Sequence, residues 1–187
     1  MTPTQSTQIP DSELFAYPHL YRKIAGALQY LSITRPDIAF AANQICQYMH
    51  APTNYHFQLL KRLLRYIKGS LDYGLPISPG NLSLRTYEEA DWASDSSDRK
   101  SVSGFCTYLG NTLISWSVKK QTTVAKSSTE AEYRSLSAAV SDVLWLRRLV
   151  QELQLPQSSP TTIYCDNTSA INCSGKKSYF SRSHQTY

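Results

Sequence analysis

The sequence predicts a mixed α/β domain preceded by a small helical segment. The first observation is a change of period. Apolar residues repeat at helical spacing up to about residue 68, whereas residues 82–91 alternate as in a strand. The second is the order of the later segments: three strands, a long amphipathic helix, another strand and a short helix. The chain has 187 residues and is 41% apolar, which suits one ordinary domain with an appendage.

Composition narrows the class of protein. The net charge of +5 is a mild bias toward anionic partners such as nucleic acid. No apolar run approaches membrane-spanning length, and the start lacks a hydrophobic signal core. The four cysteines form no Cys-x-x-Cys pair and predict reduced, mostly buried thiols rather than a zinc site. We therefore expect an intracellular protein with no membrane partner.

The N-terminal part divides into a lead-in and a helical segment. Residues 1–17 are polar and rich in Pro, Ser and Thr, and we predict that they are disordered. Residues 18–75 carry three helical patterns. The second begins near Pro36, which suits a first helical turn, and the third lies between Thr53 as N-cap and Gly69 as stop.

The outer face of the third predicted helix is basic. Two interpretations stay open for it: an ordinary solvated helix face, or a set of contacts to nucleic-acid phosphates. The residues are Lys61, Arg62, Arg65 and Lys68.

The region 81–187 is the predicted α/β domain, separated from the helical segment by Pro and Gly residues at 76–80. Its first strand ends at Asp91, and Gly110-Asn111 forms the turn between the next two strands. A capping-box pattern at 127–130 opens the long helix. The predicted elements are strands at 82–91, 102–109 and 113–118, a helix at 129–153, a strand at 161–165 and a short helix at 168–173.

Three carboxylates stand where these elements begin or end. Glu132 lies on the apolar stripe of the long helix, whereas Glu130 points roughly 160° away. A carboxylate on a core-facing stripe is costly unless a metal ion or another acid's proton meets it, although it can also rim the core and reach water. Glu89 and Asp91 share one face of the first strand, and Glu88 points to the other.

Asp166 follows the last strand, at the edge where ligand clefts of α/β sheets open. Asp and Asn in sequence can equally serve a turn. Together the acids predict a magnesium site, because Mg²⁺ prefers carboxylate oxygens. Two such ions can clamp the attacking and leaving groups of a phosphodiester.

The chain resembles the C-terminal end of a copia-type retrotransposon Pol polyprotein, over roughly residues 21–182. In that family the helical part follows the reverse transcriptase core, and the α/β part is a ribonuclease H, which degrades the RNA of RNA–DNA hybrids. The motifs that carry the resemblance are Tyr-Leu-Ser-Ile-Thr-Arg-Pro-Asp-Ile-Ala-Phe at 30–40, Leu-Leu-Arg-Tyr-Ile-Lys-Gly at 63–69, Asp-Arg-Lys-Ser-Val-Ser-Gly-Phe-Cys at 98–106, Leu-Ile-Ser-Trp-Ser at 113–117, Lys-Lys-Gln at 119–121 and Ser-Ser-Thr-Glu-Ala-Glu-Tyr at 127–133.

The resemblance implies catalytic roles for Glu89, Asp91, Glu132 and Asp166. The first, third and fourth of these would bind Mg²⁺ or Mn²⁺. The family carries aspartate where this chain has Glu89, whose side chain is one methylene longer. The family's fifth strand, and a later segment with its fourth acid, would lie beyond Tyr187. The expected fold is therefore a ribonuclease H-like mixed sheet with helices, truncated at its C-terminus and preceded by the helical segment.

Two functional interpretations remain open. The first is a magnesium-dependent ribonuclease, an endonuclease acting on RNA–DNA hybrids during reverse transcription, with the rest of a Pol polyprotein as partner. The second is a catalytically inactive remnant that is at most a non-specific nucleic-acid-binding module. Glu89 and the missing fourth acid motivate the second interpretation.

Overall fold

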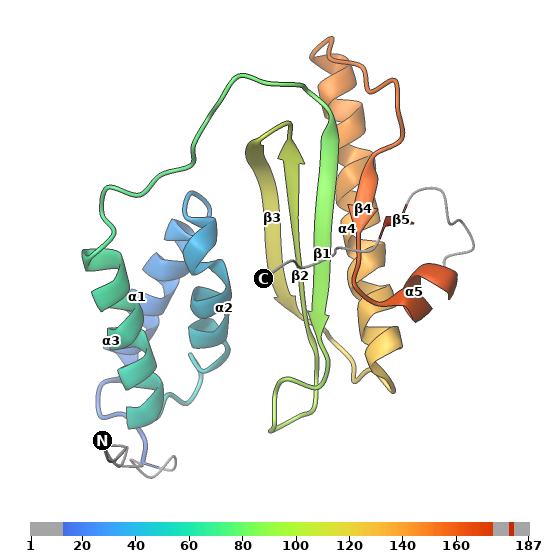
Figure 1. Cartoon of the computed structure of the whole chain (residues 1–187). Helices are drawn as coiled ribbons and strands as arrows, with labels where there is room; N and C mark the ends of the chain where they lie inside the picture. The colour runs from blue at the N-terminus through green and yellow to red at the C-terminus, as the bar shows by residue number, and fades with distance from the viewer. Residues whose placement is uncertain (1–12, 174–179, 182–187) are drawn as a thin grey trace, which may run out of the picture. The chain divides into compact units, whose positions relative to one another are not determined.

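The computed structural model of the protein divides into two compact units, with the boundary in the sequence between Gly74 and Leu75 (Figure 1). The structure describes residues 13–173 and 180–181. We refer to the part before this junction as the helical unit and to the part after it as the α/β unit. Among the described residues, no helix is both long and apolar enough to cross a membrane.

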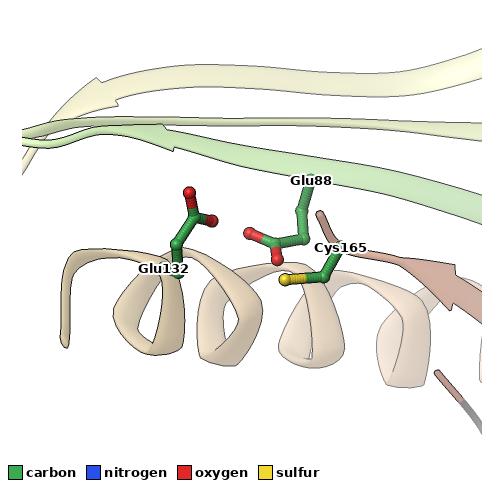
Figure 2. Close-up of side chains that lie close together, drawn as sticks. All are labelled: Glu88, Glu132 and Cys165. Atoms are coloured by element: carbon green, nitrogen blue, oxygen red, sulfur yellow. The ribbon is translucent and has the colours of Figure 1, made fainter. Parts of the chain in front are cut away.

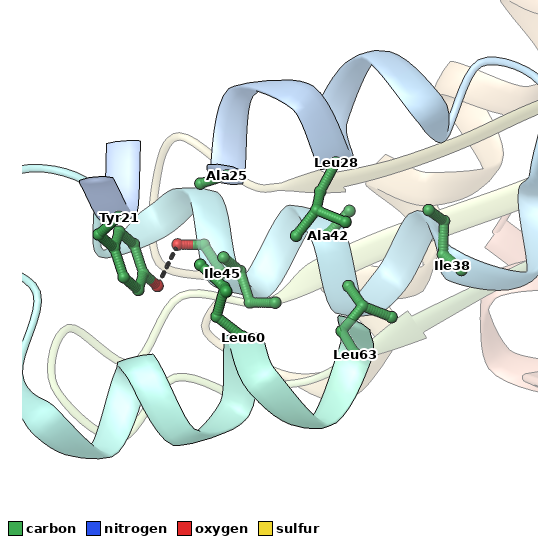
Figure 3. Close-up of a cluster of buried hydrophobic side chains, with 8 residues drawn as sticks. All are labelled: Tyr21, Ala25, Leu28, Ile38, Ala42, Ile45, Leu60 and Leu63. Carbon is green, nitrogen blue, oxygen red and sulfur yellow. Dashed lines mark hydrogen bonds between the residues drawn. The ribbon is translucent and has the colours of Figure 1, made fainter. Parts of the chain in front are cut away.

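The helical unit is built around a single buried cluster (Figure 3). In it, the hydroxyl of Tyr21 donates a hydrogen bond of 2.9 Å to the backbone carbonyl of Ile45. The helices are α1 (Pro18–Leu31), the 3₁₀ turn η1 (Pro36–Ile38), α2 (Ala39–Gln47) and α3 (Asn54–Lys68). The buried side chains are Tyr21, Ala25, Leu28, Ile38, Ala42, Ile45, Leu60 and Leu63.

The predicted ends of α3 are confirmed. Thr53 is its N-cap and accepts a hydrogen bond from the backbone N–H of His56, and Gly69 is its C-cap. The start of the chain differs from the prediction. Residues 1–12 of the expected disordered lead-in lie outside the described residues. Residues 13–15, in contrast, pair with residues 52–54, and Phe15 stacks on Phe57. The segment is ordered because Phe15, an apolar residue within an otherwise polar sequence, packs on α3.

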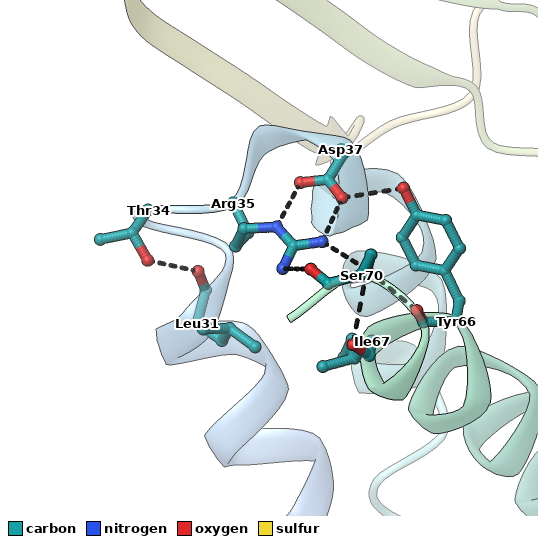
Figure 4. A network of polar contacts seen from close by, with 7 residues as sticks. All are labelled: Leu31, Thr34, Arg35, Asp37, Tyr66, Ile67 and Ser70. Atoms are coloured by element: carbon teal, nitrogen blue, oxygen red, sulfur yellow. Dashed lines mark hydrogen bonds and ion pairs between the residues drawn. The ribbon is translucent and has the colours of Figure 1, made fainter. Parts of the chain in front are cut away.

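A polar network joins the start of η1 to the end of α3 (Figure 4). The guanidinium of Arg35 donates to both carboxylate oxygens of Asp37, at 2.9 and 2.7 Å. It also donates to the carbonyl and hydroxyl oxygens of Ser70, at 2.9 and 2.8 Å. Tyr66 donates its hydroxyl to Asp37 at 3.0 Å. Hydrogen bonds from Arg35 hold the pKa of Asp37 below its usual range.

The α/β unit contains a five-stranded mixed sheet in the order β3-β2-β1-β4-β5, with α4 packed against β1 and β2 (Figure 1). The first three strands are antiparallel neighbours, whereas β4 is parallel to β1 and β5 is parallel to β4. The elements are β1 (Leu84–Asp91), β2 (Val102–Leu109), β3 (Thr112–Lys120), α4 (Ser128–Glu152), β4 (Thr162–Tyr164), α5 (Thr168–Cys173) and β5 (Phe180–Ser181).

The predicted ribonuclease H-like mixed α/β fold is confirmed. The structure adds a short strand that was not predicted, β5, in which Phe180 pairs with Ile163 of β4. The sequence concealed it because the strand has only two residues and no alternating pattern. Parallel pairing with β4 supplies the backbone partners that such a short strand needs.

Candidate metal centre

Successive side chains of β1 point to opposite faces of the sheet, and this determines which acids face the core. Glu88 has the same orientation as the buried side chains of this strand and is itself buried, whereas Glu89 and Asp91 are exposed. The backbone carbonyl of Glu89 accepts a hydrogen bond of 2.9 Å from the hydroxyl of Ser135 on α4. This contact ties the end of β1 to the first turns of the helix. The other inward residues of β1 are Leu84, Thr86 and Ala90.

The N-terminus of α4 fixes Glu132 beside β1. Ser127 caps the helix by accepting a hydrogen bond of 3.1 Å from the N–H of Glu130. The carboxylate of Glu130 then turns outward, where it meets Arg134 at 2.6 Å and the N–H of Lys126 at 2.8 Å. Glu132 is instead buried, with 4% of its surface exposed. The prediction that this glutamate faces inward is confirmed.

Asp166 follows β4 and is exposed. The next residue, Asn167, accepts a hydrogen bond of 3.0 Å from the N–H of Ala170 and so begins α5. The turn chemistry that the Asp-Asn pair suggested therefore belongs to Asn167.

Three of the predicted acids converge. One carboxylate oxygen from each of Glu89, Glu132 and Asp166 lies within 4.8 Å of the other two. These residues come from β1, from α4 and from the segment after β4, which are far apart in the sequence. The structure does not bring Asp91 into this group. We call Glu89, Glu132 and Asp166 the outer group.

Burial and mutual repulsion make the outer group receptive to a cation. Burial, followed by the charges of Glu88 and Glu89, raises the pKa of Glu132 to about 8. Burial and then the charge of Asp166 raise the pKa of Glu89. Among the described residues, Oε2 of Glu132 is buried and has no hydrogen-bond partner. An unpartnered oxygen within a set of carboxylates fits a hard divalent ion such as Mg²⁺ or Mn²⁺.

Sequence reasoning missed Glu88 and Cys165 as site residues, and both lie close to Glu132 (Figure 2). Glu88 is 5% exposed, and Cys165 is fully buried. Burial raises the pKa of Glu88 to about 7; the thiol of Cys165 and the hydroxyl of Ser135 partly offset this, and the charges of Glu89 and Asp166 add to it. The usable signal was the strand period. It places Glu88 in phase with the inward Leu84, so this glutamate points to the face that α4 covers.

The basic residues predicted on α3 are exposed and lie in the helical unit, and the outer group lies in the α/β unit. None of the four forms a salt bridge within the part of the chain that the structure describes. The ammonium of Lys61 lies 5.2 Å from the ring centre of Phe57. The residues are Lys61, Arg62, Arg65 and Lys68.

The chain is similar to long transposon proteins of plants. It is 46% identical over 183 residues to the retrovirus-related Pol polyprotein from transposon RE2 of Arabidopsis thaliana, and 44% identical over 183 residues to that from transposon RE1. Each match covers 97% of this chain and 12% of the relative. The retrovirus-related Pol polyprotein from transposon TNT 1-94 of Nicotiana tabacum is 36% identical over 163 residues, or 87% of this chain and 12% of that relative. No family model and no solved structure matches the chain.

Proposed function

Because the chain belongs to the Pol polyproteins of copia-type retrotransposons, we propose that its α/β unit is a ribonuclease H that hydrolyses the RNA strand of RNA–DNA hybrids. The chain spans about 12% of the length of these relatives, so this activity is an inference about one segment. One observation carries the proposal. One carboxylate oxygen from each of three separate elements lies within 4.8 Å of the other two, and the family resemblance implies that these three acids bind metal.

The outer group supplies what such a hydrolysis requires of the protein. Glu89, Glu132 and Asp166 would hold the ion, and Glu132, whose pKa is raised to about 8, would bind it as the carboxylate. The ion, when bound, supplies an activated water and stabilises the leaving oxygen. The resemblance implies a catalytic role for Asp91 as well, which is exposed at the end of β1 and lies outside the outer group.

A hybrid-cleavage assay with the full chain tests the proposal. We expect cleavage that requires Mg²⁺ or Mn²⁺ and that is lost in Asp166→Asn and in Glu132→Gln. The matched control is Glu130→Gln, which lies two residues from Glu132 on the same helix but points away, and which should leave cleavage unchanged. Absence of cleavage with either ion, or cleavage that persists in Asp166→Asn, would sink the proposal.

A second candidate function is non-specific nucleic-acid binding by the basic face of α3. Its support is the four exposed basic side chains that form no salt bridge among the described residues. Each phosphate contact contributes about −0.9 to the slope of log affinity against log salt for a duplex. We expect Lys61→Gln combined with Arg65→Gln to reduce this slope by about 2, and Lys23→Gln on α1 to leave it unchanged. Binding that is indifferent to salt would exclude this candidate.

A further inference from the structure

A second group of potential ligands is buried between β1, α4 and the end of β4 (Figure 2). It consists of Glu88, Glu132 and Cys165, and one ligand atom from each lies within 4.8 Å of the others. All three side chains are buried, with 5%, 4% and 0% of their surfaces exposed. We call these residues the inner group. It shares Glu132 with the outer group and differs from it by containing sulfur.

The inner group contains unpartnered buried oxygens. Both carboxylate oxygens of Glu88 and Oε2 of Glu132 lack a hydrogen-bond partner among the described residues. Figure 2 shows the Glu88 carboxylate directed into the space between the Glu132 carboxylate and the Cys165 sulfur. The thiol makes a long contact of 3.8 Å with the carbonyl of Asn167, and its other neighbour is the Glu88 carboxylate, whose charge raises the pKa of this thiol further after burial. A charged carboxylate so enclosed needs a cation to offset its lost hydration.

The donor set selects the class of cation. A thiolate with two carboxylates favours a borderline-soft ion such as Zn²⁺ over Mg²⁺, which prefers oxygen alone. With Zn–S of about 2.3 Å and Zn–O of about 2.0 Å, tetrahedral donors lie about 3.3–3.5 Å apart. The donors of the inner group already lie within 4.8 Å of one another, so coordination of one ion would require them to move closer by at most about 1.5 Å. Three protein donors leave the fourth position for water.

We propose that Glu88, Glu132 and Cys165 form a buried site for a thiophilic divalent cation of the Zn²⁺ class. On binding, the Cys165 thiol releases its proton to solvent and the thiolate coordinates the ion. Because Glu132 belongs to both groups, occupation of the inner group weakens Mg²⁺ or Mn²⁺ binding at the outer group. This second consequence rests on the proposed function, whereas the binding of zinc does not.

Cobalt spectroscopy tests the inner group without any measurement of activity. We expect Co²⁺ added to the metal-free full chain to produce a thiolate-to-cobalt charge-transfer band, and Zn²⁺ to displace it. Cys165→Ser should abolish the band and weaken Zn²⁺ binding at least about tenfold. The matched control is Cys106→Ser on β2. It removes a different thiol of the same unit, which is half-buried, and should leave the band intact. Absence of the band in the native chain, or its persistence in Cys165→Ser, would overturn the site.

Two further measurements keep the test decisive. The first is Zn²⁺ binding by Glu88→Gln, which retains every cysteine. This variant should bind Zn²⁺ at least about tenfold more weakly, while the charge-transfer band survives at saturating Co²⁺. Undiminished Zn²⁺ affinity in this variant refutes the role of Glu88.

The second measurement is electron paramagnetic resonance of bound Mn²⁺, which reports on the outer group. Release of Mn²⁺ by one equivalent of Zn²⁺ supports the sharing of Glu132, and Mn²⁺ bound equally with and without Zn²⁺ contradicts it. Loss of hybrid cleavage alone would bear on the proposed function only.

Discussion

Relative to the native chain, the Glu88→Gln variant should gain stability as the pH rises. The carboxyl group is 5% exposed and its pKa is raised from 4.5 to about 7, mainly by burial. The unfolded chain therefore loses this proton at lower pH than the folded chain. Between the two pKa values the folded state holds more protons, so the stability of the native protein falls as the pH rises from about 4.5 to about 7. Above that window the cost is constant.

The size of the effect follows from the shift. A change of about 2.5 pKa units at about 1.36 kcal/mol per unit gives about 3 kcal/mol as the full cost of ionising Glu88 in place. The amide of Gln also needs hydrogen-bond partners, and leaving it unpartnered costs about 1–3 kcal/mol at every pH. The amide cost cancels when the same variant is compared at two pH values. We therefore expect the stability of Glu88→Gln relative to the native chain to improve by up to about 3 kcal/mol between about pH 5 and about pH 8.

Urea unfolding followed by tryptophan fluorescence measures this difference. The chain has three tryptophans, at positions 92, 116 and 145, and all of them lie in the α/β unit. A chelator in every sample keeps cations out of both groups. Glu130→Gln is the control, because its lowered pKa, held down by the N–H of Lys126, predicts an opposite and smaller change with pH. If the free energies of unfolding of Glu88→Gln and the native chain differ by the same amount at both pH values, the reasoning is refuted.

Three further predictions concern other residues. Glu89→Asp installs the aspartate that the family resemblance implies at this position, so we expect hybrid cleavage to rise by up to about a hundredfold. This factor is the rate penalty that a displaced catalytic group can carry, and an unchanged rate would argue against it. Asp37→Asn should lower the thermal midpoint at neutral pH. The difference should shrink as the pH falls through the pKa of Asp37, which Arg35 holds low, and circular dichroism melts would show it. Tyr21→Phe removes the buried hydrogen bond to Ile45 and should cost the helical unit about 1 kcal/mol in urea unfolding; no loss would contradict this.

Much of the fold followed from local patterns in the sequence. Thr53 and Ser127 are N-caps because their side chains satisfy free N–H groups at helix starts, which is a matter of a few adjacent residues. The turn at Gly110 was equally local, since this residue has a φ of 60° that glycine adopts without strain. β5 could not be predicted, because its two residues depend on pairing with β4.

The candidate site could be predicted only where local sequence was sufficient, as was true of the fold. Glu132 could be assigned because the apolar stripe of α4 identifies its buried face by itself. The first strand defines two faces, but local sequence does not say how tightly a helix will cover the inward one. Glu88 was thus recognised as pointing away from Glu89 and was not recognised as buried against Glu132. Cys165 required the same long-range information, because α4 and β4 bring it there.

Burial of the ionised Glu88 carboxylate raises the free energy of the folded chain, and a cation bound at the candidate metal centre would offset part of this cost. Its charge is the largest electrostatic contribution to the raised pKa of Glu132, so it favours a proton on that residue. Coulomb energy is proportional to the product of charges, so a divalent cation at the same place gains about twice what a proton gains from Glu88. Glu88 therefore favours the ion over the proton. We expect Glu88→Gln to bind Mn²⁺ at the outer group more weakly than the native chain at about pH 8, where its relative stability is higher than at about pH 5. Paramagnetic resonance titration measures the affinity, and Mn²⁺ binding as tight as that of the native chain would show that Glu88 contributes only cost.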